Sequence, residues 1–547
     1  MAYGGYHRLR VLVVDDFDSF RMTISRFLQD FGVSQVDTVG NGQEAIRLCA
    51  SKGYDLILCD YNLGPGKNGQ QVLEELRQRE IIGIGCLFAL VSAESSKNIV
   101  LAAYDSGPDA YLTKPITAKA LQQRLDRLLA ERDEMLPICQ LLGEGDTEGA
   151  IAACEERIAK NSRYASSCQK RLSQLYLDTQ QYDKAEQLYQ QVLQVRPLDW
   201  AQLGLAKVKQ ATGDLNRAGE WLSDIIQNNP MCMPAYDALA ENCRLQNNDQ
   251  KLQQVLQDAG EMSPMALLRQ QSLAQTAAEN NDLIVAATAY KRAVRLGQNS
   301  CYDNVDTHLN FARTTAALFK ESPSDVKDLA RDALRALDML PKNFVVDKER
   351  GFQSQLVQAQ IYAFQGDSSR SSTQLQEVET QLKEEGFTLG LDASIDLFQA
   401  LEATGEGSRS KLLLDDLIEK YKDNQDAMNK IDRLLDEPVS DANRKQVAQI
   451  NKQGIRLYEN KNFAEAITLF QKARCLFPNH IGVQLNMVQA QLGEMREYGA
   501  EVDCMETCLS IMARIGSNIS PNHSQARRHR QLYELLRNVE RESKANG

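Results

Sequence analysis

Four short apolar runs in the N-terminal part of the chain each end in polar side chains. They end at Asp15-Asp16, at Asp60, at Ser92 and at Lys114. Three carboxylates held close together would repel one another and raise one another's pKa, so their assembly implies a bound cation. An oxygen-only site with few protein ligands suits Mg²⁺, which keeps waters and completes its shell with phosphate oxygens.

The remaining polar groups favour phosphoryl chemistry at this cation site. A lysine ammonium and a serine hydroxyl, from Lys114 and Ser92, could hold the other oxygens of a phosphoryl group. Asp60 would then be an in-line nucleophile that forms an aspartyl phosphate. An ionised carboxylate needs no separate general base for this step.

Alternating strand and helix patterns are expected to position these residues. The expected strands are Leu9–Val14, Val36–Val39, Asp55–Cys59, Cys86–Val91 and Ala110–Leu112. The expected helices are Phe20–Phe31, Gln43–Ala50, Gln70–Arg79, Lys97–Asp105 and Thr117–Arg132. This order predicts an α/β fold with a doubly wound, five-stranded parallel sheet. Ligands of such sheets bind beyond the carboxyl ends of the strands, which is where Asp15-Asp16, Asp60, Ser92 and Lys114 are expected.

With these motifs in this order, residues 8–130 resemble the receiver domain of two-component response regulators, the flavodoxin-like fold of the chemotaxis regulator. The resemblance implies that Asp60 is the phosphoacceptor. It implies that Asp15, Asp16, Asp60 and the backbone carbonyl of Asn62 hold Mg²⁺. It also implies a sensor histidine kinase or a phosphotransfer protein as the phosphoryl donor.

The same resemblance assigns roles at five positions around this site. Ser92 and Lys114 would contact the phosphoryl group, and Tyr111 would be the aromatic switch residue that turns inward as Ser92 moves. Asn62 and Glu94 occupy the positions that tune phosphoryl lifetime, and this polar pair resembles the fast-hydrolysing chemotaxis type.

The loop after Asp60 departs from the family pattern. Members usually have Met-Pro after the acceptor and a glycine about eight positions on, whereas this chain has Leu63-Gly64-Pro65 and places Gly69 nine positions after Asp60. The loop is therefore expected to be one residue longer, which would affect kinase docking or water access. A degenerate receiver with an inert acidic cluster is the alternative.

Beyond residue 130, strand patterns disappear and helical repeats follow. Pro197, Pro230 and Pro264 are spaced by 33 and 34 residues, the spacing of tetratricopeptide (TPR) repeats. Small residues such as Gly204 and Gly454 would let paired helices approach, with aromatic residues filling the space opposite. The sequence therefore predicts an all-α, TPR-type solenoid. Its curved surface would bind a protein partner.

The expected organisation has five parts. These are a receiver (1–130), a junction (131–145), a first TPR block (146–300), a degenerate TPR-like helical region (301–440), and C-terminal TPR repeats with a capping helix (441–547). For the junction, a helix shared between receiver and repeats competes with a hinge at Pro137, Gly143 and Gly145.

Composition narrows the classes of function. The net charge of −12 and a pI near 5.2 argue against nucleic acid or an anionic membrane as the main partner. The sequence shows no apolar run long enough to span a bilayer and no signal peptide, so a cytoplasmic location without membrane insertion is expected. The 12 cysteines contain no Cys-x-x-Cys pair and are interpreted as free core thiols.

These features predict a bacterial, phosphorylation-controlled signalling adaptor. Asp60 would accept a phosphoryl group, and the repeats would carry the output through protein binding rather than DNA binding. No independent catalytic motif is found in the repeats, so the chain is expected not to be an enzyme apart from possible self-dephosphorylation. The alternatives are a constitutive scaffold with an unused receiver and a regulator that holds an enzyme in trans.

Overall fold

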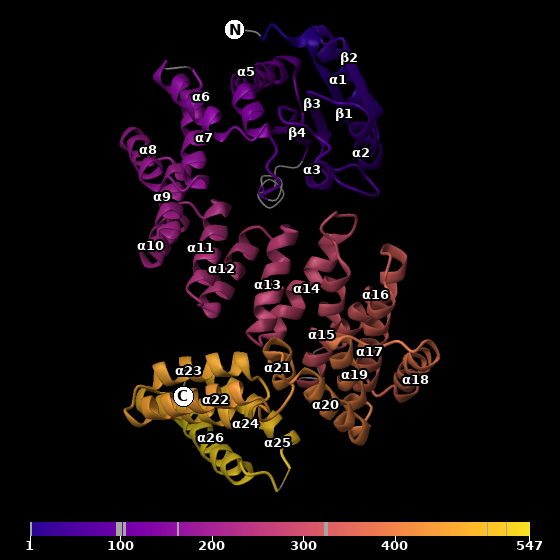
Figure 1. The fold of residues 1–547 in the computed structure, drawn as a ribbon, viewed down its shortest axis with the longest axis vertical. Coiled ribbons are helices and arrows are strands. Elements are labelled where there is room, and N and C mark those ends of the chain that lie inside the picture. The colour runs from indigo at the N-terminus through magenta and orange to yellow at the C-terminus, as the bar shows by residue number, and fades with distance from the viewer. Residues whose placement is uncertain are drawn as a thin grey trace. The chain divides into compact units, whose positions relative to one another are not determined.

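A computed structural model describes residues 3–93, 101, 105–160, 163–321, 326–499, 502–520 and 522–546 (Figure 1). An α/β domain comes first in the chain and helices make up the remainder. Contacts divide the chain into two compact units, one of residues 1–276 with 292–304 and one of residues 277–291 with 305–547.

A five-stranded parallel sheet forms the centre of the α/β domain. Its strands are β1 (Arg10–Val14), β2 (Gln35–Val39), β3 (Leu56–Asp60), β4 (Leu87–Ser92) and β5 (Ala110–Thr113). The strand order is β2-β1-β3-β4-β5. Asp60 lies opposite Val91, and Ser92 lies opposite Thr113. This register brings the carboxyl ends of β1, β3, β4 and β5 to one edge, as the sequence predicts.

Helices cover both faces of the sheet. Helices α1 (Asp18–Asp30) and α5 (Ala118–Gly143) pack on one face through Ile24, Leu28 and Leu125. Helices α2 (Gly42–Ser51) and α3 (Gly69–Gln78) pack on the other through Ile46 and Leu73. Strand residues alternate between the two cores, as expected for strands buried on both sides.

The predicted strands and the first three helices are found within two residues of their expected limits. The helix expected over Lys97–Asp105 lies mostly outside the described residues. The predicted end of the last receiver helix at Arg132 is wrong, because α5 continues to Gly143. Met135, Ile138 and Leu142 on this extension pack against the first helices of the repeat region, and that burial continues the helix through Pro137.

Helical hairpins follow α5 and α6 (Thr147–Ala159) at a constant period. The first four hairpins are α7 (Ala165–Asp178) with α8 (Tyr182–Val195), α9 (Asp199–Ala211) with α10 (Leu215–Asn228), α11 (Met233–Leu245) with α12 (Asp249–Met262), and α13 (Leu267–Glu279) with α14 (Leu283–Gly297). Their first helices begin 34 residues apart. This region is consistent with a TPR-like solenoid.

Longer helices make up the rest of the chain. They are α15 (Val305–Glu321), α16 (Lys327–Asn343), α17 (Lys348–Phe364), α18 (Ser368–Glu385), α19 (Leu391–Ala403), α20 (Gly407–Tyr421), α21 (Gln425–Asp432), α22 (Asp441–Glu459), α23 (Phe463–Leu476), α24 (Ile481–Tyr498), α25 (Val502–Asn518) and α26 (Ala526–Asn546). The non-helical segment 433–440 between α21 and α22 is held by the buried Asp432 carboxylate. That carboxylate accepts hydrogen bonds from the Val439 amide and the Ser440 hydroxyl.

Small residues allow close helix packing, as the sequence predicts. A Cβ atom on Gly204 would lie 2.2 Å from the Tyr189 ring, and one on Gly454 would lie 2.4 Å from the Phe470 ring. A larger residue would therefore push the paired helices apart.

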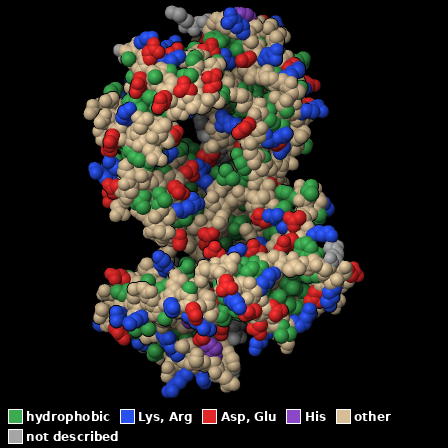
Figure 2. Space-filling view, viewed as in Figure 1, with side chains coloured by type: hydrophobic (Ala, Val, Ile, Leu, Met, Phe, Trp, Pro, Cys, Tyr) green, Lys and Arg blue, Asp and Glu red, His purple; other side chains and the backbone are tan. Residues whose placement is uncertain are grey.

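Three further features concern the surface charges, the cysteines and the apolar character of the helices. Acidic and basic side chains are interspersed over the face seen in Figure 2. All twelve cysteines are free thiols. Among the helices that the structure describes, none is both long and apolar enough to cross a membrane.

Candidate functional site

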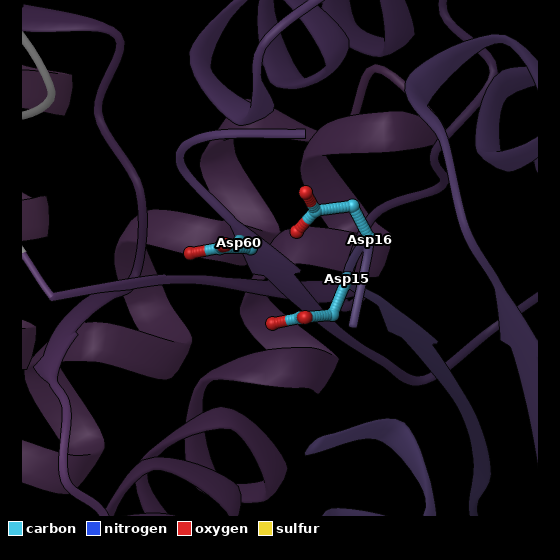
Figure 3. Close-up of side chains that lie close together, drawn as sticks. All are labelled: Asp15, Asp16 and Asp60. Atoms are coloured by element: carbon cyan, nitrogen blue, oxygen red, sulfur yellow. The ribbon is translucent and has the colours of Figure 1, made fainter. Parts of the chain in front are cut away.

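Three carboxylates meet at the carboxyl edge of the sheet. Asp15 and Asp16 follow β1, and Asp60 is the last residue of β3. One oxygen from each lies within 4.8 Å of the others. Figure 3 shows the three side chains pointing into a common space. Asp15 is fully buried and Asp60 is 6% exposed, whereas Asp16 is exposed to solvent.

Lys114 joins this carboxylate cluster from the end of β5. Its Nζ lies 2.7 Å from Asp15 Oδ2 and 3.2 Å from Asp60 Oδ2. Burial alone would lower the pKa of Lys114, but its hydrogen bond to Asp15 and the charges of both carboxylates outweigh that effect and raise it. With three carboxylates and one ammonium, the cluster retains two negative charges, which is the charge that a divalent cation would balance.

The environment of Asp60 makes ionisation of its carboxyl group less favourable than it is in water. Burial raises the pKa of Asp60 to about 6, and the negative charge of Asp15 adds to this, while Lys114 opposes it. A cation placed among the three carboxylates would favour the ionised form. Their oxygen donors and residual charge therefore fit Mg²⁺.

Two residues of α1 brace the site and were not predicted from the sequence. The Arg21 guanidinium donates a hydrogen bond to the Asp15 carbonyl oxygen. The Lys114 ammonium lies 4.1 Å from the centroid of the Phe20 ring, a cation–π distance. The helical pattern of this segment indicated only which side chains face the core, so it contained no signal for either contact.

The other predicted residues surround the cluster in different ways. Ser92 is buried at the end of β4, and its carbonyl oxygen accepts a hydrogen bond from the Lys114 amide at 2.8 Å. Tyr111 is half-buried and packs against the core between the sheet and helices α2 and α3. Asn62 is exposed, and its Oδ1 accepts a hydrogen bond from the Gly64 amide at 3.4 Å. Glu94 lies outside the described residues.

The loop between β3 and α3 is closed by its own backbone. The Gly69 amide donates to the Tyr61 carbonyl oxygen at 2.8 Å. A Cβ atom on Gly69 would lie 2.2 Å from the Asp60 carbonyl oxygen, so only glycine fits at this position. Gly64 and Gly66 both have positive φ values, a backbone conformation that glycine adopts without strain.

The chain resembles known proteins over this N-terminal part. Residues 11–126 match the family described as the response regulator receiver domain. The chemotaxis protein CheY-3 of Vibrio cholerae is 27% identical over 121 residues, which cover 22% of this chain and 91% of that protein. The chemotaxis protein CheY of Pseudomonas aeruginosa is 28% identical over 120 residues, which cover 22% of this chain and 95% of that protein.

A solved structure of CheY4 from Vibrio cholerae has 28% sequence identity, covers 22% of this chain and 98% of its own, and has a TM-score of 0.21. Three observations fall on the same N-terminal segment: the similarity in sequence, the order of the strands and the carboxylate cluster. The chain therefore carries an N-terminal CheY-like receiver domain of the response regulator type, followed by a long all-helical region.

Proposed function

We propose that the protein is a signalling adaptor whose receiver accepts a phosphoryl group on Asp60 and whose helical region delivers the signal by binding a protein partner. The observation that carries this proposal is the contact of Lys114 with both Asp15 and Asp60 beside Asp16. This arrangement brings together a carboxylate nucleophile, the ammonium of Lys114 and the oxygen ligands for a divalent metal.

In the proposed reaction, a carboxylate oxygen of Asp60 forms a bond to phosphorus. The bond between phosphorus and the phosphohistidine nitrogen of a sensor kinase or phosphotransfer protein breaks. Lys114 would offset charge on the phosphoryl oxygens, and Ser92 would donate a hydrogen bond to one of them. Asp15 and Asp16 would hold Mg²⁺ together with Asp60 and the carbonyl of Asn62; when bound, the metal neutralises phosphoryl charge.

The roles of the remaining receiver residues belong to the same proposal. Tyr111 would follow Ser92 toward the core when the phosphoryl group is present. Asn62 and Glu94 would set the lifetime of the acyl phosphate.

The helical region is proposed to act through protein contact rather than DNA. An open groove of about 580 Å³ between α22 and α23 supports a binding surface. Its lining combines apolar Leu457 and Leu469 with basic Arg456 and Lys472 and one acidic residue, Glu465. This combination suits a partner segment that has both apolar and acidic side chains.

Phosphorylation can be tested directly on the full chain. We expect Mg²⁺ with acetyl phosphate to add one phosphoryl group, detected as an intact-mass increase that hydroxylamine removes. The Asp60→Asn variant should take up none, and Asp55→Asn, which changes a partly exposed carboxylate at the opposite end of β3, should remain competent. A wild-type chain that stays unmodified would favour the scaffold with an unused receiver.

A further inference from the structure

The longer loop between β3 and α3 contacts a distant part of the same compact unit. Lys67 Nζ donates a hydrogen bond to the Asn299 carbonyl oxygen. Asn299 Nδ2 donates in return to the Gly66 carbonyl oxygen at 3.2 Å. Four residues after Lys67, Gln71 Nε2 donates to the Gln298 carbonyl oxygen at 2.9 Å. Residues 298 and 299 follow α14, so this loop of the receiver is docked on the turn that ends the fourth hairpin.

The lysine in this contact is held in place on its receiver side. Lys67 Nζ lies 3.0 Å from Glu75 Oε2 on α3, and both side chains are largely buried. Burial opposes ionisation of Glu75, but hydrogen bonds from Lys67 and Arg79 outweigh it and lower the pKa of Glu75. A partly desolvated ion pair fixes the position of Lys67 more strongly than an exposed pair would.

A second contact connects the receiver to the end of α12 and the start of α13. The Asp105 carboxylate accepts hydrogen bonds from Ser263 Oγ at 3.0 Å and Arg269 Nη1 at 2.5 Å. Arg269 also forms two hydrogen bonds to the Asp237 carboxylate, both 2.8 Å long. Ser263 is fully buried, and the Arg269 side chain is 11% exposed. The charge of Asp105 is therefore matched by the guanidinium of Arg269, which Asp237 also holds.

Helix α3 joins the two contacts. Its first turn carries Gln71, and its last turn carries Arg77, whose Nη2 donates to the Gly107 carbonyl oxygen at 2.7 Å, next to Asp105. Glu74, between them, accepts a hydrogen bond from Ser106 Oγ at 2.8 Å. A displacement of α3 would therefore disturb both contacts together.

Helix α3 also begins directly against the proposed phosphoacceptor. Gly69 bonds to the Tyr61 carbonyl oxygen and packs against the backbone of Asp60, with no room for a Cβ atom between them. A rearrangement of residues 60–62 must therefore move the loop, the start of α3, or both, because packed interiors respond to strain in discrete shifts.

We infer that Gly66, Lys67, Gln71 and Asp105 form a regulatory docking contact on residues 263–269 and 298–299 of the same chain, and that phosphorylation of Asp60 weakens it. This inference rests on the proposed function. A phosphoryl group on Asp60 requires a rearrangement of residues 60–62, at the start of the loop. The docking contact holds the later part of the same loop in place through Gly66 and Lys67. Coupling of this kind is reciprocal, so loss of the contact makes phosphorylation more favourable.

The test is amide hydrogen exchange measured by mass spectrometry on the full chain, with and without acetyl phosphate and Mg²⁺. In the unmodified chain, Lys67→Ala should speed exchange in residues 298–304 about tenfold, and phosphorylation of the wild type should do the same. Lys52→Ala is the matched control, because its Nζ pairs with Asp37 elsewhere on the receiver. At the same acetyl phosphate concentration, Lys67→Ala should also reach a higher phosphorylated fraction than the wild type, measured by intact mass.

A second variant probes the contact from the repeat side. Asn299 has a φ of +65°, so Asn299→Gly removes the side-chain donor while keeping a permitted backbone. It should speed exchange in residues 61–71 of the receiver. Unchanged exchange in both variants would overturn the docking contact.

A separate result would contradict the control of the docking contact by phosphorylation of Asp60. If intact mass shows a phosphorylated wild type whose residues 298–304 exchange no faster, the docking contact is not controlled by Asp60. A wild type that takes up no phosphoryl group overturns the proposed function and the switch together, while the two unmodified variants still decide whether the docking contact exists.

Discussion

At the scale of single residues, the site is defined by one buried acid with a shifted pKa. The Lys114 ammonium contacts both the Asp60 carboxylate and the fully buried Asp15 carboxylate. Burial raises the pKa of Asp60 to about 6, so a proton competes with any cation for this carboxylate below that pH. Metal binding and phosphoryl acceptance both require the ionised form.

This competition predicts a pH-dependent affinity for Mg²⁺. Because the proton occupies Asp60 below its pKa, we expect apparent Mg²⁺ affinity to be about tenfold weaker at pH 5 than at pH 7.5. Titration calorimetry on the full chain measures this ratio. The residual binding of Asp60→Asn should lose most of the pH dependence between pH 5 and 7.5. An equal pH dependence in that variant would assign it to another carboxylate.

At the scale of elements, the start of α3 is placed by the strand that precedes it. Asn68 caps the helix, with its side chain accepting a hydrogen bond from the Gln71 amide while Gln71 returns one to the Asn68 amide. Gly69, between them, packs against the Asp60 carbonyl oxygen. The helix, the loop and the proposed phosphoacceptor therefore share one set of backbone contacts.

A single methyl group should disturb this arrangement. Gly69→Ala would place a Cβ atom 2.2 Å from the Asp60 carbonyl oxygen, so α3 must shift. We expect a loss of about 1–3 kcal/mol in receiver stability, the usual cost of overpacking, and slower phosphoryl uptake. Hydrogen exchange of the β3 and α3 amides measures the first effect, and intact mass measures the second.

Gly53→Ala is the control for this substitution. Nothing lies within 4 Å of a Cβ atom built at Gly53, so both quantities should remain close to the wild-type values. Equal effects at the two glycines would show that backbone flexibility, rather than the close approach to Asp60, is responsible.

At the scale of the whole molecule, two compact units share one chain. The chain passes from one unit to the other within α13, again within α14, and once more at the start of α15, because residues 277–291 belong to one unit and residues 292–304 to the other. The receiver belongs to the unit that also holds the 34-residue hairpins up to residue 276. The stability of helical repeats is approximately the sum of the stability of each repeat and of its interfaces with adjacent repeats. A destabilising substitution should therefore act mainly on the repeats around it.

Two matched glycine substitutions test this locality. Gly204→Ala would force a Cβ atom against Tyr189 in the first unit, and Gly454→Ala would force one against Phe470 in the second. Each should lower the local stability by about 1–3 kcal/mol. Hydrogen exchange along the chain should show faster exchange chiefly in the unit that carries the substitution; equal effects in both units would indicate a single cooperative fold.

The sequence by itself determined the sheet, its strand ends and the repeat period. Polar residues at the ends of buried strands identify Asp15, Asp16, Asp60 and Lys114, because parallel strands bring their carboxyl ends to one edge. Periodic small residues identify the hairpins, since only such residues permit close helix packing. These are local patterns, and the chain follows them locally.

The tertiary structure alone decided what depends on distant partners. The continuation of α5 past Arg132 depends on burial against helices later in the chain, and the support of the site by Phe20 and Arg21 depends on how α1 lies over the sheet. The contact between the longer loop and residues 298–299 joins positions more than two hundred residues apart. No local pattern encodes such a pairing, because its energy comes from desolvation and hydrogen bonds that exist only after the chain has folded.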